Sequence, residues 1–172
     1  MVQRLRSLAK PVVCAVNGVA AGAGANIVFG CDIVLAANTA KFVQSFAKVG
    51  LIPDAGGTYH LTQILGPLRA KAWAMTATPI TAQTAQDWGL VWQCFEADVL
   101  LDAAQKMTAD LARGATLGLA QTKHAIHKAG QMDLEAHMAL EAEIQRACGQ
   151  SADYLEGVTA FLDKRPAQYS GR

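Results

Sequence analysis

Short apolar runs separated by turn residues organise the beginning of the chain. The run PVVCAV at residues 11–16 is typical of a strand and ends at Asn17-Gly18, a turn dipeptide. Small residues follow, and the apolar segment that closes with DIVLAA at 32–37 predicts a helix leading into a second strand. A helix start of this kind leaves backbone N–H groups without partners inside the helix.

Three short helices and a strand are predicted over residues 55–95. The first helix, 55–66, has Leu61, Ile64 and Leu65 on one face and ends at Gly66-Pro67. A second helix covers roughly 68–77. A third begins after the capping residue Thr81 and closes at Gly89, and LVWQCF at 90–95 reads as a strand.

Helical spacing dominates from Val99 to the end of the chain. Two sets of residues show it: Leu100, Ala103, Ala104, Met107 and Leu111, then Leu134, His137, Met138, Glu141 and Ile144. Ser151 is placed to cap a last helix over 152–165. The pattern contains no internal repeat.

Composition and charge exclude several classes of protein. The chain has 172 residues, 52% hydrophobic and 17% charged, with a net charge of +1, which indicates a core-rich globular protein. This balance offers no electrostatic footprint for nucleic acid or an anionic membrane. The apolar stretch 12–37 contains Asn17, Asn26 and Asp32, so we expect buried core and not a membrane span.

The cysteines and the N-terminus favour a cytoplasmic protein without a metal. Four cysteines show no C-x-x-C pair and no histidine at metal-ligand spacing, so we expect reduced thiols and no zinc site: Cys14, Cys31, Cys94 and Cys148. No apolar run with a cleavage site marks a signal peptide near the start.

The glycine-rich segment GVAAGAG has two interpretations. Its order is neither that of a dinucleotide fingerprint nor that of a phosphate-binding loop. One interpretation is close packing between a helix and a strand. The other is an oxyanion hole, in which an N–H at the helix start stabilises negative charge on a thioester oxygen.

Asp54, in GLIPDAGGT, also has two interpretations. An aspartate before a glycine pair and a helix is a good N-cap. Its neighbours Leu51, Ile52 and Pro53 are apolar, however, and such surroundings disfavour an ionised carboxyl and poise it as a general base. His60 could line the same pocket or serve a structural role, and no nucleophile elbow or catalytic triad appears.

Four sequence blocks follow one another over nearly the whole chain: KPVVCAVNGVAAGAGANIVFGCDIVLAANTAKF, KVGLIPDAGGTYHL, TAQTAQDWGLV and SADYLEGVTAFLDKR. In order and spacing they resemble the enoyl-CoA hydratase/isomerase (crotonase) family. The resemblance implies an α/β crotonase-like β-β-α spiral, present here as its C-terminal part over residues 1–98. It further implies a helical oligomerisation region over 99–172 and a homotrimer or a dimer of trimers.

The resemblance also assigns roles at the predicted site. An oxyanion N–H falls at Ala23, flanked by Gly22 and Gly24, and the implied substrate contacts include these two glycines, Asn26 and Phe46. The two positions where hydratases carry catalytic glutamates are Asn26 and Phe46, so two-carboxylate water addition is not supported. Isomerases of the family often carry a single acid after the Ile-Pro pair, which is Asp54 here. The family therefore implies that Asp54 carries a proton and that Phe46 keeps water from the intermediate.

The implied substrate is an acyl-CoA, with no metal and no redox cofactor, and the implied reaction shifts a double bond or opens a ring epoxide. Phe161 and Lys164 match a stretch placed near the adenosine and phosphate of CoA, although Lys164 also fits a solvated helix position. Family members carry a further portion before KPVVCAVNG that supplies a second oxyanion donor. We therefore expect this chain to lack that portion, and a non-catalytic subunit and an enoyl-CoA hydratase stay as alternatives.

Overall fold

The computed structural model describes residues 2–171 as two compact units. The first comprises residues 2–6 and 12–107, and the second comprises residues 7–11 and 108–171. Their division falls inside helix α5 (Leu100–Ala112), whereas the sequence-based boundary at 98/99 precedes that helix. The assignment of a core region and an oligomerisation region stays a prediction.

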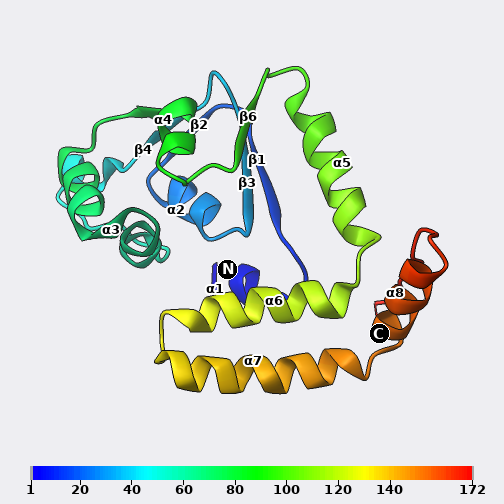
Figure 1. Cartoon of the computed structure of the whole chain (residues 1–172). Coiled ribbons are helices and arrows are strands. Elements are labelled where there is room, and N and C mark those ends of the chain that lie inside the picture. Colours follow the sequence, from blue (N-terminus) through cyan, green and yellow to red (C-terminus); the bar gives the residue numbers. More distant parts are fainter. Residues whose placement is uncertain (1, 172) are drawn as a thin grey trace. The chain divides into compact units, whose positions relative to one another are not determined.

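A parallel three-stranded sheet forms the centre of the first unit. Its order is β1-β3-β6, with bounds Val13–Val16, Ile33–Ala37 and Gln93–Phe95. Helix α2 (Ala23–Phe29) leads into β3, and a short strand of a second sheet precedes this helix in the chain (Figure 1). The predicted order of strand, turn, helix and strand is confirmed, apart from a short additional strand between the turn and the helix. The predicted strand over 90–95 is observed only from Gln93, as β6, although the N–H of Trp92 already donates to the carbonyl of Val34.

A second small sheet was not predicted. It has the order β2-β4-β5, with bounds Val19–Ala21, Lys41–Val43 and Ile80–Thr81. Strands of two or three residues are too short to show alternation in a sequence. The sheet matters for function because β2 leads directly into α2 and β4 leads into the short 3₁₀ helix η1 (Ser45–Val49).

Two further helices of the first unit follow their sequence signals. Helix α3 (Gly57–Thr76) is broken at Gly66, where φ is 73° and ψ is 164°, followed by Pro67, so two helices meet there as predicted. Helix α4 (Ala82–Asp87) is capped by Thr81, whose hydroxyl accepts the N–H of Thr84 at 3.1 Å.

Aromatic and aliphatic side chains fill the core between these elements. The ring centroid of Phe29 lies 5.6 Å from that of Phe42 and 6.0 Å from that of Trp73. Leu35 and Leu61 are fully buried beside them. This packing joins α2 to both sheets and to α3, so the start of α2 has a rigid support.

The second unit is helical. Helices α6 (Thr116–Ala129) and α7 (Leu134–Gly149) run antiparallel to each other, and α8 (Ala152–Leu162) follows (Figure 1). Ser151 caps α8 as predicted, accepting the N–H of Tyr154 at 3.1 Å. No residue of α6 or α7 is buried within this chain.

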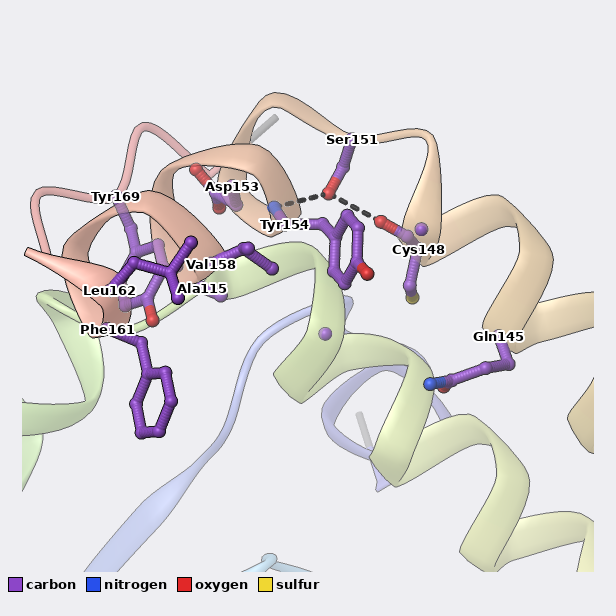
Figure 2. A pocket seen from close by; sticks show the side chains of 13 residues that line it. Ala115, Gln145, Cys148, Ser151, Asp153, Tyr154, Val158, Phe161, Leu162 and Tyr169 are labelled. Carbon is purple, nitrogen blue, oxygen red and sulfur yellow. Dashed lines mark hydrogen bonds between the residues drawn. The ribbon is translucent and has the colours of Figure 1, made fainter.

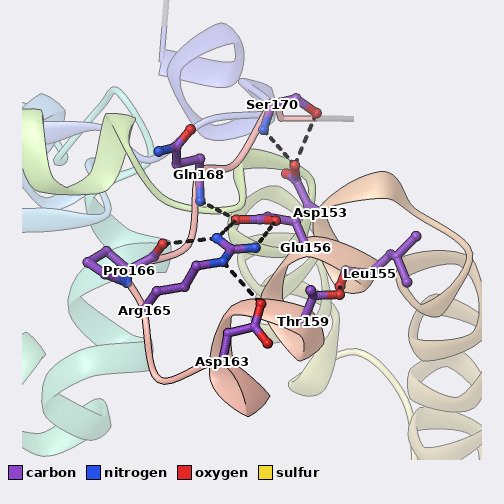
Figure 3. Close-up of polar contacts among 9 residues, drawn as sticks. All are labelled: Asp153, Leu155, Glu156, Thr159, Asp163, Arg165, Pro166, Gln168 and Ser170. Atoms are coloured by element: carbon purple, nitrogen blue, oxygen red, sulfur yellow. Dashed lines mark hydrogen bonds and ion pairs between the residues drawn. The ribbon is translucent and has the colours of Figure 1, made fainter.

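The predicted last helix is too long by three residues. Helix α8 ends at Leu162, and the N–H of Arg165 reaches back to the carbonyl of Ala160 at 3.0 Å while Lys164 adopts a left-handed conformation with φ of 52°. This is a Schellman ending. Arg165 then binds Glu156 through two hydrogen bonds, and Asp153 holds Ser170 and Gly171 (Figure 3).

A short N-terminal helix, α1 (Val2–Ser7), precedes the first sheet. The Arg6 guanidinium lies 5.3 Å from the ring centroid of Tyr59 on α3. None of the helices in the described part of the chain is both long and apolar enough to cross a membrane.

Candidate active site

Asp54 begins a tight turn and not a helix. The N–H of Gly57 donates to the carbonyl of Asp54 at 2.8 Å, and the two residues between them, Ala55 and Gly56, have φ values of 49° and 81°. Two central residues with positive φ define a type I′ turn. Helix α3 begins after it, with Gly56 at its N-cap. The N-cap interpretation of Asp54 is therefore wrong, because the turn separates its carboxylate from the first helical N–H groups.

The Asp54 side chain is exposed in this chain. Its neighbours Leu51 and Ile52 are 63% and 78% exposed, so the expected apolar enclosure is not formed by the residues described. Within residues 2–171, no hydrogen bond or ion pair to the carboxylate is found. The carboxylate is thus open to a ligand and is not neutralised by a protein cation.

Asn26 joins the Asp54 turn to helix α2. Its side chain is fully buried, and its Nδ2 donates to the backbone carbonyl of Asp54 at 2.9 Å. Its own N–H donates to the carbonyl of Gly22 at 3.1 Å, at the beginning of the helix. A Cβ on Gly57 would lie 2.2 Å from the Asn26 amide, so only glycine allows this approach. Asn26 was expected to contact substrate; that role stays a prediction, whereas the contact with the turn is observed.

The start of α2 offers a backbone donor. Gly22, with φ of 53° and ψ of −125°, turns the chain from β2 into the helix, and Ala23 is the first helical residue. In the described part of the chain, no acceptor is found for the N–H of Ala23. Ala23 is partly exposed and Gly24 is exposed, so a ligand oxygen can reach this N–H.

Phe46 lies beside this helix start. The residue is 8% exposed, and its ring is 3.6 Å from the position that a Cβ on Gly22 would take. A larger residue at Gly22 would meet this ring and the Ser45 hydroxyl. The predicted role of Phe46 in excluding water is compatible with that position and stays a prediction.

Two buried side chains near the turn, Gln44 and His60, have contacts that the sequence did not predict or left open. Gln44 is fully buried, and its Nε2 donates to Asn26 Oδ1 at 2.8 Å. A lone glutamine after a short strand gives no sequence signal of such a role. His60 is 7% exposed, and a Cβ on Gly56 would lie 3.1 Å from its Nε2, so the imidazole packs beneath the turn in the structural role that was one of its two interpretations.

The predicted CoA contacts belong to the second unit. Phe161 is 82% exposed on α8 and lines a cavity of about 410 Å³, together with residues such as Tyr154 and Tyr169 (Figure 2). Lys164 is exposed and stands at the left-handed position that ends α8, so the alternative interpretation holds for its solvation but not for a place inside the helix. Contact of Phe161 and Lys164 with CoA stays a prediction.

The remaining groups considered are the cysteines and the possible metal ligands. Among residues 2–171, none of the four cysteines forms a disulfide, and each is partly buried. In the same range, no three His, Cys, Asp or Glu side chains gather into a group that could hold a metal ion.

Comparison with known proteins identifies the family. The family model described as enoyl-CoA hydratase/isomerase matches residues 1–172. The chain is 48% identical to the 1,2-epoxyphenylacetyl-CoA isomerase of Escherichia coli, over all of this chain and 66% of that protein. It is 44% identical to the "Probable enoyl-CoA hydratase" of Rhodobacter capsulatus, over all of this chain and 67% of that protein.

The solved structures agree with the sequence relatives. The crystal structure of an enoyl-CoA hydratase from Polaromonas sp. superposes with a TM-score of 0.94 at 37% identity, over 98% of this chain and 65% of that one. The predicted crotonase-like α/β fold is thereby confirmed. The chain spans about two thirds of the length of these relatives. It belongs to the enoyl-CoA hydratase/isomerase family.

Proposed function

We propose that the chain acts as an acyl-CoA isomerase that moves a double bond through a thioester dienolate. The observation that carries this proposal is the bond from Asn26 to the Asp54 turn. It ties the candidate base, Asp54, to the helix whose first N–H, that of Ala23, has no acceptor among residues 2–171. A base and an oxyanion donor on one rigid framework are what proton transfer next to a carbonyl requires.

The steps follow from the chemistry of the two groups. The Asp54 carboxylate takes a proton from the carbon between the thioester carbonyl and the double bond of a 3-enoyl-CoA. The electron pair moves into a dienolate, whose negative charge rests on the thioester oxygen beside the N–H of Ala23. The protonated Asp54 then returns the proton to the far carbon, and the double bond becomes conjugated with the thioester. No metal and no redox cofactor enters these steps, and CoA is part of the substrate.

The same logic extends to a strained ring. In a ring-epoxide acyl-CoA, breaking the bond between the two epoxide carbons gives a seven-membered oxepin. Removal of a proton next to the thioester carbonyl would then give a dienolate of the same kind, and return of that proton by Asp54 to a ring carbon would complete the isomerisation. The name of the Escherichia coli relative, 1,2-epoxyphenylacetyl-CoA isomerase, supports this second substrate class, with a place in phenylacetate degradation. Linear 3-enoyl-CoA substrates of fatty acid metabolism are the first class to test, because they need only the double-bond shift.

Hydration is the alternative that the hydratase-named relatives favour. Water addition in this family uses two carboxylates, and the corresponding positions here hold the buried amide of Asn26 and the buried ring of Phe46. Neither side chain can activate water.

The other alternative is a non-catalytic subunit that only assembles, as a homotrimer or a dimer of trimers in the cytoplasm. The unburied faces of α6 and α7 support an assembly.

The test uses the purified chain, its Asp54→Asn variant and a matched Asp102→Asn variant, whose exposed acid lies in the first turn of α5. With a 3-enoyl-CoA we expect formation of the conjugated 2-enoyl-CoA. Asp54→Asn lowers kcat by about 10²–10⁴-fold, the range for a lost general base, and Asp102→Asn leaves it unchanged. Equal rates in all three would remove Asp54 from the mechanism. A 3-hydroxyacyl product would favour the hydratase alternative, and absence of turnover by the unsubstituted chain would favour the non-catalytic subunit.

A further inference from the structure

A chain of two buried amides leads away from the Asp54 turn. Asn26 Nδ2 donates to the carbonyl of Asp54 at 2.9 Å, and Gln44 Nε2 donates to Asn26 Oδ1 at 2.8 Å. A backbone carbonyl can only accept, so the direction of both bonds is set by Asp54. Gln44 is therefore required as a donor, and no carboxylate or aliphatic side chain at its position can take this role.

The burial of Gln44 carries a free-energy cost that an apolar side chain at this position would avoid. The whole residue is 0% exposed, and its Oε1 has no hydrogen-bond partner among residues 2–171. An unsatisfied buried carbonyl is unfavourable, and a methionine of similar length would fill the space without it. A buried polar group that fixes one arrangement of its neighbours is a known reason to accept such a cost.

Gln44 also connects three separate segments of the first unit. It stands between β4 and η1, immediately before Ser45 and Phe46, which both pack against Gly22 at the start of α2. Its hydrogen bond to Asn26 links it to α2, and the hydrogen bond from Asn26 to the carbonyl of Asp54 links it further to the Asp54 turn. The segment that borders the oxyanion donor and the segment that carries the base thus share one hydrogen-bonded link.

We propose that Gln44 is a positioning residue that, through Asn26, holds the Asp54 turn at a fixed place relative to the N–H of Ala23. This inference rests on the proposed isomerase function and deepens it. Gln44 is fully buried, so we expect no contact with substrate. Its loss should therefore reduce the rate of the proton-transfer step more than it weakens acyl-CoA binding.

The test compares Gln44→Met with Gln86→Met. Gln86 is a matched control in the same unit, because its Oε1 accepts the N–H of Cys94 at 2.9 Å and has no link to Asp54. For Gln44→Met we expect kcat to fall by about tenfold or more, with KM within about twofold. For Gln86→Met we expect kcat and KM to stay as in the unsubstituted chain, even where its melting temperature falls.

A readout independent of activity separates this inference from the proposed function. Amide hydrogen exchange is measured at the N–H of Gly57, which closes the Asp54 turn. Gln44→Met should speed exchange at Gly57 by about tenfold relative to amides of β3, because the turn opens locally. Exchange that rises equally across the unit would indicate general destabilisation and overturn the positioning role.

The outcomes divide clearly. A Gln44→Met variant with unchanged kcat and unchanged exchange at Gly57 would overturn the inference. If the unsubstituted chain shows no isomerase activity, the proposed function fails, and exchange at Gly57 still decides whether Gln44 holds the turn. Faster exchange confined to the turn supports that link, and unchanged exchange rejects it.

Discussion

Asn26 and Asp54 are 28 residues apart in sequence and are joined by a 2.9 Å hydrogen bond from a side-chain amide to a backbone carbonyl. Because the bond goes to the backbone, it holds the turn without engaging the carboxylate. The carboxylate of Asp54 therefore keeps its lone pairs available to a ligand. An asparagine is suited to this task, since a glutamate or aspartate there would place a negative charge beside the base.

Gly57→Ala should disrupt this link. A Cβ at Gly57 would lie 2.2 Å from the Asn26 amide, which is closer than any tolerated contact. We expect the free energy of unfolding to fall by about 1–3 kcal/mol, measured by urea denaturation. The control is Gly118→Ala in α6, where the nearest atom to the new Cβ is 4.0 Å away. That change should stabilise by about 0.5–1 kcal/mol. Equal effects of the two substitutions would contradict the close approach.

Ala55→Gly should stabilise the chain. Ala55 has φ of 49°, a left-handed conformation that costs an alanine about 1–2 kcal/mol. Glycine removes that strain, but the greater entropy of its unfolded chain costs about 0.4–1 kcal/mol. The free energy of unfolding should therefore rise by a net amount of about 0.5–1 kcal/mol. The same substitution at Ala109, an exposed residue inside α5, should destabilise by about 1 kcal/mol. Thermal unfolding should show a higher melting temperature for Ala55→Gly and a lower one for Ala109→Gly. A lower melting temperature in both variants would reject the left-handed turn.

Ala23→Pro tests the backbone donor directly. Proline has no N–H and is tolerated at the first position of a helix, which Ala23 occupies in α2. If the N–H of Ala23 stabilises the dienolate, kcat should fall by about 10²–10³-fold, while circular dichroism shows a retained fold. Ala23→Gly keeps the N–H and serves as the control. An unchanged rate in the proline variant would exclude this donor from the mechanism.

The end of the chain should respond to acid at a defined pH. Hydrogen bonds from Arg165 and from the N–H of Gln168 lower the pKa of Glu156 from 4.5 to about 2. The ionised carboxylate therefore stabilises the folded tail fully above pH 4.5, and this contribution is lost as the pH falls toward 2. The Gln168 amide resonance should titrate with a midpoint near 2 and not near 4.5. Glu156→Gln should abolish the titration and loosen residues 166–171 at neutral pH.

Local sequence signals determined much of the fold. The turn after β1, the break at Gly66-Pro67 and the caps Thr81 and Ser151 each depend on the φ preference or the side-chain oxygen of one residue. Such effects act within a few residues, so they can be predicted from the residues alone. The glycine-rich start of α2 belongs to this group, because small residues and a positive φ at Gly22 are local requirements. The family resemblance likewise depended on the order of such local blocks.

Only the tertiary structure decided how the site is held together. The second sheet consists of strands too short to give a periodic pattern, and the Asp54 turn has a left-handed alanine where a helix cap was one of two interpretations of the sequence. The bonds from Gln44 to Asn26 and from Asn26 to Asp54 join residues 18 and 28 positions apart. Contacts at such separations depend on the packing of the whole unit, which brings the β4–η1 segment, α2 and the turn together. The sequence by itself therefore determined the local elements and predicted the candidate groups at the site, and the packing decided which side chains hold the Asp54 turn in place.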